Sequence, residues 1–311
     1  MYTSAHNYNI ITLNILKEVF FIDNFVIITD SGSDLPKEII DKFSIHSIGL
    51  ICNFNDKEYI DEYGKSIDYK TFYDGLRNGA MPITSQINSF RFFETFEKYT
   101  KENIPIVYIA FSSALSGTYN SSLIAREEIL EKYPNADISI IDSRSASLGV
   151  GFLVYEACRL RENGASKDDV VNHIENIKLK VNHIFTVNDL NHLKRGGRIS
   201  PAVATIGSLL QVKPLLYMPE DGTLQNFSKV KGRKKAIKTL YSYFEEKFDY
   251  SKDDTIFVSH GDCLEEAEKL ASIIKEKYDV NIIINYIGPV IGSHSGPNTL
   301  AIFFKGLDRN L

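Results

Sequence analysis

The fold of this chain is decided by one stretch, Ile106-Val107-Tyr108-Ile109-Ala110-Phe111-Ser112-Ser113-Ala114-Leu115-Ser116-Gly117-Thr118-Tyr119-Asn120. Its apolar start predicts a buried strand, its serines and glycine predict a tight loop, and residues 121–133 predict a helix. A strand, loop and helix in this order point backbone N–H groups and hydroxyls at one spot, which suits an anion. A serine or threonine in such a loop can equally serve to cap the helix that follows, and the stretch alone favours neither role.

The segments on both sides of this stretch alternate between strands and helices. Phe25 to Thr29 and Asp137 to Ile141 are further apolar runs, and each ends in a polar loop before a helical pattern. Thr84 or Ser85 is expected to cap a helix that begins near Asn88. Parallel sheets gather such strand-end loops at their carboxyl edge, where ligands bind. We therefore predict an α/β fold in which the N-terminal domain has a mainly parallel sheet.

A change of pattern in the middle of the chain predicts two α/β domains. Gly164 to Asp169 combines a helix stop with a new N-cap. We place the boundary between residues 170 and 171, which gives an N-terminal domain over residues 25–170 and a C-terminal domain over residues 171–311. Residues 202–211 of the second domain are expected to form a helix.

Residues 1–24 fit this pattern poorly. The apolar patch from Ile10 to Ile22 is interrupted by polar residues, and it lacks the basic start and the cleavage site of a signal peptide. One hypothesis is a mis-assigned start, because Lys17-Glu18-Val19 can be encoded by a purine-rich ribosome-binding site with Ile22 as a non-ATG start codon. We therefore treat residues 1–24 as an N-terminal extension; on the hypothesis of a mis-assigned start, the natural protein would begin near Ile22.

The composition argues against several classes of protein. A chain of 311 residues with 43% hydrophobic and 24% charged residues is long enough for two hydrophobic cores. Its net charge of -5 argues against general nucleic-acid binding, and no apolar run approaches the roughly 18 residues of a membrane span. The widely separated Cys52, Cys158 and Cys263 are expected to be reduced, mostly buried thiols of a cytoplasmic protein, with no disulfide framework and no metal site.

Two further motifs carry residues that suit an anion. Arg195-Gly196-Gly197-Arg198 places guanidinium groups beside a tight turn, and the fork of Arg198 suits a carboxylate or a phosphate. The alternative is that Arg195 and Arg198 brace a loop between the domains. Gly288 to Pro297 is a Gly- and Pro-rich loop that holds His294 in a rigid setting, where the ring can donate to an oxyanion. A purely structural histidine is the alternative there.

A cluster of basic residues is present on a chain that is acidic overall. It suits docking of an acidic partner or a phosphate group, and it is equally compatible with an ordinary solvated helix face. Its members are Lys229, Lys231, Arg233, Lys234, Lys235 and Lys238.

Six short motifs, taken together and in order, resemble those of the DegV family. They are Thr29-Asp30-Ser31, Thr84-Ser85-Gln86, Ser112-Ser113-Ala114-Leu115-Ser116-Gly117-Thr118-Tyr119, Arg195-Gly196-Gly197-Arg198-Ile199-Ser200, Lys213-Pro214 and Gly288-Pro289-Val290-Ile291-Gly292-Ser293-His294-Ser295-Gly296-Pro297. Each motif alone is weakly specific, but the set runs from about Phe25 to Gly306 and so covers nearly the whole chain.

The resemblance implies a two-domain α/β protein that buries a long-chain fatty acid near the domain interface and is not itself an enzyme. It implies a partner, a separate ATP-dependent fatty acid kinase, to which the protein presents the fatty acid carboxylate for acyl-phosphate formation. No cofactor, metal or nucleic acid is implied, and any membrane contact would be transient.

By motif match, the carboxylate would be bound by Thr84, Ser116, Gly117 and His294. Support of the site or docking of the kinase would fall to Arg198, Lys231 and Arg233.

The chemistry of these side chains agrees with such a ligand, because a carboxylate taken out of water needs several hydrogen-bond donors. Two other functions remain open at this point. Ser116, His294 and Asp142 could form the triad of a serine acyl hydrolase, although Leu115-Ser116-Gly117 is not the usual nucleophile motif. Hydroxyl-rich loops also bind sugars and phosphosugars.

Overall fold

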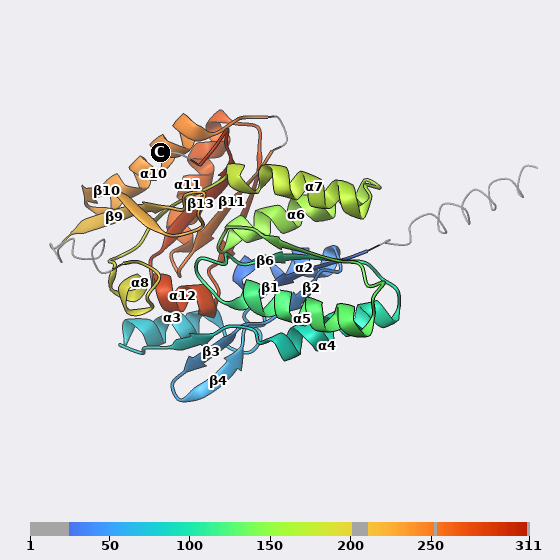
Figure 1. Cartoon of the computed structure of the whole chain (residues 1–311). Helices are drawn as coiled ribbons and strands as arrows, with labels where there is room; N and C mark the ends of the chain where they lie inside the picture. The colour runs from blue at the N-terminus through green and yellow to red at the C-terminus, as the bar shows by residue number, and fades with distance from the viewer. Residues whose placement is uncertain (1–24, 201–210, 252–253, 310–311) are drawn as a thin grey trace, which may run out of the picture.

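The computed structural model of the protein describes residues 25–200, 211–251 and 254–309. The N-terminal extension over residues 1–24 and most of the helix expected over residues 202–211 lie outside the described residues. Figure 1 shows a mixed α/β molecule in which the first half of the chain, in blue to green, lies against the second half, in yellow to red. Each half contributes one large sheet.

The first large sheet has four parallel strands in the order β2-β1-β6-β7. Its strands are β1 (Val26–Asp30), β2 (His46–Ile48), β6 (Ile106–Ala110) and β7 (Ile138–Asp142). Ile27 and Ile28 point to opposite faces and belong to two different core clusters, so both faces are covered. This explains the continuous apolar runs, and the predicted parallel sheet is confirmed.

Helices cover both faces of this sheet. α6 contacts β1 and β6 on one face, while α4 and α5 pack together on the other face. The cap of α4 is Asn88, whose side chain accepts the Arg91 N–H at 3.0 Å; the expectation that Thr84 or Ser85 caps it was wrong, because both lie in a strand. The helical elements of this half are η1 (Ser31–Ser33), α2 (Lys37–Lys42), α3 (Tyr69–Arg77), α4 (Ser89–Lys101), α5 (Thr118–Lys132), α6 (Leu148–Glu162), α7 (Lys167–Ile177) and η2 (Lys178–Lys180).

A small antiparallel sheet brings Thr84 toward the carboxyl edge of the parallel sheet. Its central strand β3 (Ile51–Phe54) pairs with β4 (Lys57–Ile60) on one side and with β5 (Ile83–Ser85) on the other. Thr84 in β5 lies opposite Cys52 in β3. The side chain of Thr84 therefore has a fixed direction set by the strand pairing.

The second large sheet has six strands in the order β10-β9-β8-β13-β11-β12. Only the β11–β12 pairing among them is parallel. The strands are β8 (Val181–Thr186), β9 (Val212–Tyr217), β10 (Gln225–Lys231), β11 (Thr255–His260), β12 (Asn281–Tyr286) and β13 (Leu300–Lys305), and the helices of this half are α8 (Asn191–Arg195), α10 (Arg233–Lys247), α11 (Leu264–Lys277) and α12 (Pro289–Ser295).

Helix α6 lies between the two large sheets, since it contacts β1 and β6 of one and β8, β11 and β13 of the other (Figure 1). The predicted boundary between residues 170 and 171 falls inside α7, and the division into two domains stays a prediction. Across the residues that the structure describes, no helix combines the length and the apolar character needed to cross a membrane.

Candidate functional site

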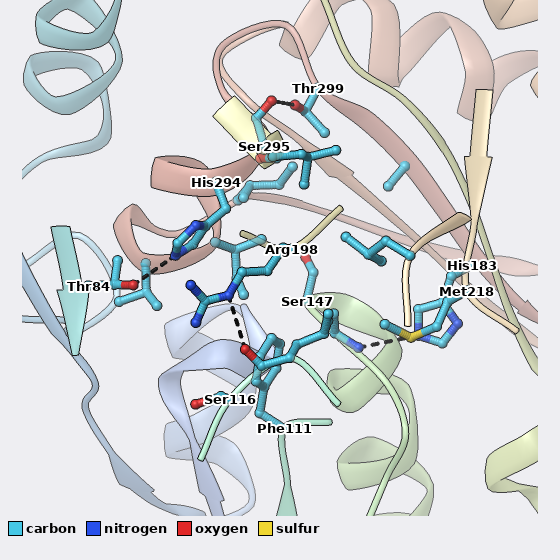
Figure 2. A pocket seen from close by; sticks show the side chains of 18 of the residues that line it. Thr84, Phe111, Ser116, Ser147, His183, Arg198, Met218, His294, Ser295 and Thr299 are labelled. Atoms are coloured by element: carbon cyan, nitrogen blue, oxygen red, sulfur yellow. Dashed lines mark hydrogen bonds between the residues drawn. The ribbon is translucent and has the colours of Figure 1, made fainter. Parts of the chain in front are cut away.

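One cavity lies where the carboxyl ends of the parallel strands meet the second large sheet (Figure 2). It offers about 210 Å³ to the centre of a water-sized sphere, which is far more than a single ordered water needs. Both halves of the chain contribute to its walls, and these are mostly apolar. Among the apolar lining residues are Phe111, Phe185, Met218, Ile287, Val290 and Phe303.

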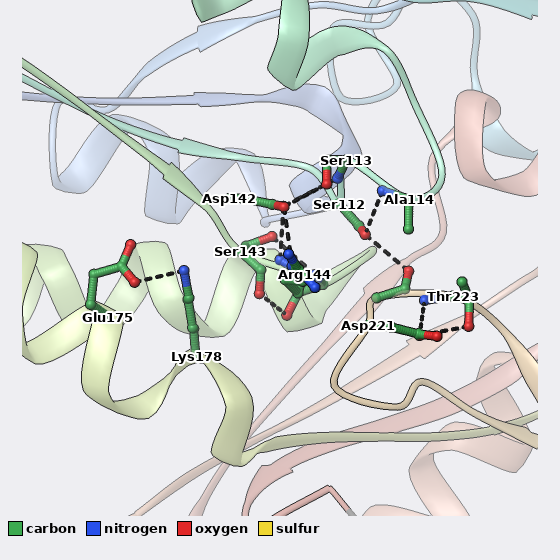
Figure 3. Close-up of polar contacts among 12 residues, drawn as sticks. Ser112, Ser113, Ala114, Asp142, Ser143, Arg144, Glu175, Lys178, Asp221 and Thr223 are labelled. Carbon is green, nitrogen blue, oxygen red and sulfur yellow. Dashed lines mark hydrogen bonds and ion pairs between the residues drawn. The ribbon is translucent and has the colours of Figure 1, made fainter.

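The loop after β6 forms one wall of this cavity. Its first serines hold the loop in place: Ser112 donates to the Gly222 carbonyl at 2.9 Å, and Ser113 donates to Asp142 through both its N–H and its hydroxyl (Figure 3). Ser116 and Gly117, which come next, line the cavity. The loop is thus fixed at its base, while its tip meets the cavity.

Ser116 also satisfies the start of α5. Its hydroxyl lies 2.9 Å from Thr118 Oγ1 and accepts the Thr118 N–H at 3.3 Å, and the N-cap residue itself is Gly117, without a side chain to donate or accept. The helix begins at Thr118, three residues earlier than expected. The expectation of a serine or threonine N-cap was therefore wrong, although Ser116 still contacts the first residue of the helix and also lines the cavity.

Thr84 and His294 meet across the two halves of the chain. Thr84 Oγ1 lies 2.7 Å from His294 Nε2, and the pair stands at one side of the cavity in Figure 2. His294 belongs to the short helix α12, so the expectation of a loop over residues 288–297 was wrong. Burial, followed by the positive charges of Arg198 and Arg195, lowers the pKa of His294 to about 4. The ring is therefore neutral at pH 7.

The backbone of Gly196 packs directly against the other nitrogen of this ring. A Cβ at position 196 would lie 2.0 Å from His294 Nδ1. Nδ1 is buried and has no hydrogen-bond partner within the described part of the chain. The motif Arg195-Gly196-Gly197-Arg198 thus supplies a glycine where His294 leaves no room for a side chain.

Arg198 lies at the same end of the cavity. Its guanidinium donates to the Leu115 carbonyl at 3.0 Å and to the Gly196 carbonyl at 2.6 Å, which agrees with the bracing role weighed for this residue. Arg198 also lines the cavity, and burial lowers the pKa of its guanidinium. Among the described residues no acid pairs with it, so its positive charge faces the cavity uncompensated.

A second histidine, His183, lies on the opposite side of the cavity, and both of its ring nitrogens are hydrogen-bonded to the backbone. His183 Nδ1 lies 2.9 Å from the Val181 carbonyl and must donate to it, so Nε2 accepts the Ala146 N–H at 3.4 Å. Burial holds the pKa of His183 well below its ordinary value, which keeps the ring neutral. Figure 2 shows His183 and Met218 across the cavity from Thr84 and His294. The cavity therefore has a polar, positively charged end and an apolar end.

The structure brings five of the predicted residues together and leaves two apart. Thr84, Ser116, Gly117, Arg198 and His294 all line the cavity. Lys231 is exposed at the end of β10, and Arg233 forms an ion pair with Glu266 at 2.6 Å; neither lines the cavity.

The three side chains considered for a hydrolase triad are bonded elsewhere. Ser116 contacts Thr118, His294 contacts Thr84, and Asp142 accepts from Ser113 and lies 3.3 Å from the guanidinium of Arg144. No hydrogen bond joins any two of these three described side chains. The arrangement therefore offers no preformed nucleophile and base.

Gln86 is a cavity residue that the sequence motifs contained but whose role was not assigned. Its Nε2 donates to Ser121 Oγ at 2.9 Å, and its Oε1 lies 2.1 Å from where a Cβ would stand on Gly117. Gln86 follows Thr84 at a spacing of two, which places both on one side of an extended segment. That alternation was the signal that could have identified it.

Comparison with known proteins gives this fold a family. A sequence model of the DegV family matches residues 24–306. The chain belongs to the DegV family. A DegV domain-containing protein of Clostridium perfringens is 56% identical over 283 residues, which cover 91% of this chain and 97% of that protein.

Solved DegV structures share the fold. The crystal structure of DegV from Bacillus subtilis, described as a fatty acid binding protein, is 34% identical, with a TM-score of 0.80 over 91% of this chain and 99% of that one. A DegV family protein from Thermus thermophilus, whose structure concerns its fatty acid binding, is 28% identical, with a TM-score of 0.82 over 91% of this chain and 99% of that one. The mixed α/β fold expected from the sequence is therefore confirmed as that of DegV proteins.

Proposed function

We propose that this DegV protein binds a long-chain fatty acid, with the acyl chain along the apolar part of the cavity and the carboxylate at its polar end. The observation that carries this proposal is Arg198, a half-buried cation without an acidic partner among the described residues, at one end of a mostly apolar cavity. A ligand that matches both features has a single anionic group on a long apolar body. The fatty acid binding of the Bacillus subtilis and Thermus thermophilus relatives supports the same ligand class.

The polar end has enough donors for one carboxylate. The hydroxyls of Thr84 and Ser116 and the N–H of Gly117, which lies at the start of α5, can each donate. Arg198 supplies the opposite charge. A carboxylate buried without such partners would lose several kcal/mol of hydration free energy. Hydrogen bonds from these donors and the charge of Arg198 offset that loss.

The apolar end supplies most of the binding free energy in this proposal. Each methylene group moved from water to an apolar wall contributes about 0.8 kcal/mol. His183 does not disturb this, because both of its ring nitrogens are already hydrogen-bonded and the ring is neutral. In this proposal the acyl chain therefore contacts the apolar end of the cavity, and the carboxylate contacts the polar end.

A matched pair of ligands and a matched pair of variants test this proposal. Oleate is expected to bind in a direct titration more tightly than oleyl alcohol, which has the same chain but no carboxylate. Arg198→Met should weaken oleate binding by at least about tenfold, whereas Arg195→Met, which removes an arginine outside the cavity lining, should leave it nearly unchanged. Equal binding of the acid and the alcohol, or equal effects of the two variants, would contradict the proposed carboxylate site. Displacement of oleate by glucose 6-phosphate would favour the phosphosugar alternative.

We further propose that the bound carboxylate is presented to a separate ATP-dependent fatty acid kinase, and that this protein performs no catalysis itself. Exposed lysines on β10 and α10 support an acidic partner; they are Lys229, Lys231, Lys234, Lys235 and Lys238.

Acyl-phosphate formation tests this second proposal. Trapping with hydroxylamine should detect an acyl-phosphate only when this protein, oleate, ATP and the kinase are all present, and Lys231→Glu should reduce the rate without changing oleate affinity. A product formed without the kinase, or covalent labelling of Ser116 by a fluorophosphonate probe, would show that the chain is itself an enzyme.

A further inference from the structure

The N-terminus of α12 lacks a capping side chain from its own segment. Its N-cap residue is Gly288, its first helical residue is Pro289, and no side chain of the cap residue accepts a hydrogen bond. The first N–H groups of a helix nevertheless need acceptors when they are buried. Two carboxylates from the first half of the chain lie at this terminus: Asp34 accepts the Gly288 N–H at 2.9 Å, and Asp61 interacts with the backbone N–H of Val290.

Both carboxylates are fixed by further bonds. Asp34 also accepts the Ser147 hydroxyl at 2.5 Å, and its own carbonyl accepts the Asn285 side-chain N–H at 2.7 Å. Asp61 interacts with the hydroxyl of Ser31 and the backbone N–H of Tyr63, and both lower its pKa. Each aspartate is only 3% exposed. The acceptors of α12 are therefore held rigidly by the first half of the chain.

Both carboxylates lie close to Gly288, the N-cap residue of α12. A Cβ at Gly288 would lie 2.8 Å from Asp34 Oδ1 and 3.1 Å from Asp61 Oδ2, so the close approach requires glycine there. Burial is the main cause that raises the pKa of Asp61 to about 7 and that of Asp34 well above its ordinary value, and the repulsion between them adds to the shift for Asp34. The pair therefore carries fewer than two charges near pH 7, which reduces the repulsion at the helix terminus.

Helix α12 links these carboxylates to the ligand cavity. Val290, Ile291 and His294 of this helix line the cavity, and His294 meets Thr84 at 2.7 Å. Because α12 has only seven residues, a shift or rotation at its N-terminus moves His294 as well.

We propose that Asp34 and Asp61 are positioning residues that clamp the N-terminus of α12 onto the first half of the chain and so hold His294 against Thr84 at the polar end of the cavity. This role rests on the proposed function in so far as it concerns fatty acid affinity. The clamp itself is a property of the ligand-free protein, so the two can be tested separately.

Asp30 is the matched control for this clamp. It is as deeply buried as the other two, but its carboxylate accepts from Gly32, Tyr108 and Phe111, all in the first half of the chain. Loss of its side chain removes a buried carboxylate without touching α12. An effect seen in Asp34→Ala and Asp61→Ala but not in Asp30→Ala is therefore due to loss of the clamp and not to a general loss of stability.

Amide hydrogen exchange over residues 286–296 of the ligand-free protein measures the clamp directly. Asp34→Ala and Asp61→Ala should each speed exchange of α12 by at least about tenfold, and Asp30→Ala should not. Asp34→Asn keeps an acceptor for the Gly288 N–H and should restore most of the protection. If Asp34→Ala does not fold, Gly288→Ala takes its place. It keeps both acids but forces them away from the helix terminus, so it should also speed exchange of α12. Unchanged exchange in the clamp variants, or equal exchange in Asp30→Ala, would overturn the proposal.

Oleate titration of the same variants tests the consequence for binding. Asp34→Ala and Asp61→Ala should weaken oleate by at least about tenfold relative to Asp30→Ala. If α12 is loosened but oleate affinity is unchanged, the proposed positioning of His294 is wrong. If the unaltered protein does not bind oleate at all, the proposed function fails, while the exchange data still decide whether the clamp exists.

Discussion

The hydroxyl of Thr84 lies 2.7 Å from Nε2 of His294, although the two residues are 210 positions apart in the chain. One belongs to a small antiparallel sheet in the first half, and the other belongs to a short helix in the second half. This contact closes the polar end of the cavity across the two halves of the chain. A change at either residue should therefore affect both the ligand and the packing of the halves.

Ser116→Ala removes one hydroxyl from the polar end of the cavity. We expect it to weaken oleate binding by about 1 to 3 kcal/mol, because a charged acceptor then lacks a donor. Ser272→Ala is the control, since Ser272 is exposed on α11, donates to the Glu268 carbonyl and does not line the cavity. Isothermal titration of the two variants decides the matter, and equal affinities would remove Ser116 from the site.

Gly196→Ala should act through His294. The backbone of Gly196 has ordinary helical angles, so alanine is not strained there, but its Cβ would lie 2.0 Å from His294 Nδ1. The ring must move away, and we expect a lower melting temperature together with weaker oleate binding. Thermal unfolding and titration of one sample measure both. An alanine variant with unchanged affinity would show that the position of His294 does not matter for the ligand.

The neutral state of His294 predicts a pH dependence of stability. Its pKa is about 4 in the folded protein against an ordinary 6.5, so the unfolded chain takes up the proton first as the pH falls. Its contribution should thus destabilise the fold progressively from about pH 6.5 to pH 4, by about 3 kcal/mol at most. Urea unfolding of the unaltered protein and of His294→Gln should show a shallower loss in the variant over this range. Parallel curves would contradict the shift.

Asp61 predicts a dependence of the opposite sign. Its pKa is raised from 3.8 to about 7 by burial, so the unfolded chain loses the proton first as the pH rises. The unaltered protein should lose up to about 4 kcal/mol of stability through this group between about pH 4 and pH 7. Asp61→Asn cannot ionise and should lack this part of the decline in urea unfolding curves. A variant with the same slope would show that Asp61 is already ionised in the fold.

Much of this arrangement could be predicted from local patterns. The apolar runs that end in serine and aspartate loops predicted the parallel sheet, and Thr84, Ser116, Gly117, Arg198 and His294 do line one cavity. What these residues do there stays a proposal, as does the cytoplasmic location.

The helical state of residues 289–295 could not be predicted in the same way. Glycine and proline favour a loop locally, whereas α12 is helical in the fold, where Asp34 accepts the Gly288 N–H and Asp61 lies beside the same helix terminus. Those aspartates are more than 220 residues earlier in the sequence, so no local pattern reports them. Gln86 differs, because its spacing of two from Thr84 is visible in the sequence, although its contact with Gly117 is seen only in the fold.

The central claim, that the cavity holds a long-chain fatty acid by its carboxylate, is tested most directly by native mass spectrometry of the gently purified protein. The predicted result is a bound mass equal to one long-chain fatty acid, present in the unaltered protein and in Arg195→Met and strongly reduced in Arg198→Met. Repeated absence of such a mass from the unaltered protein, together with no uptake of added oleate, would contradict the claim.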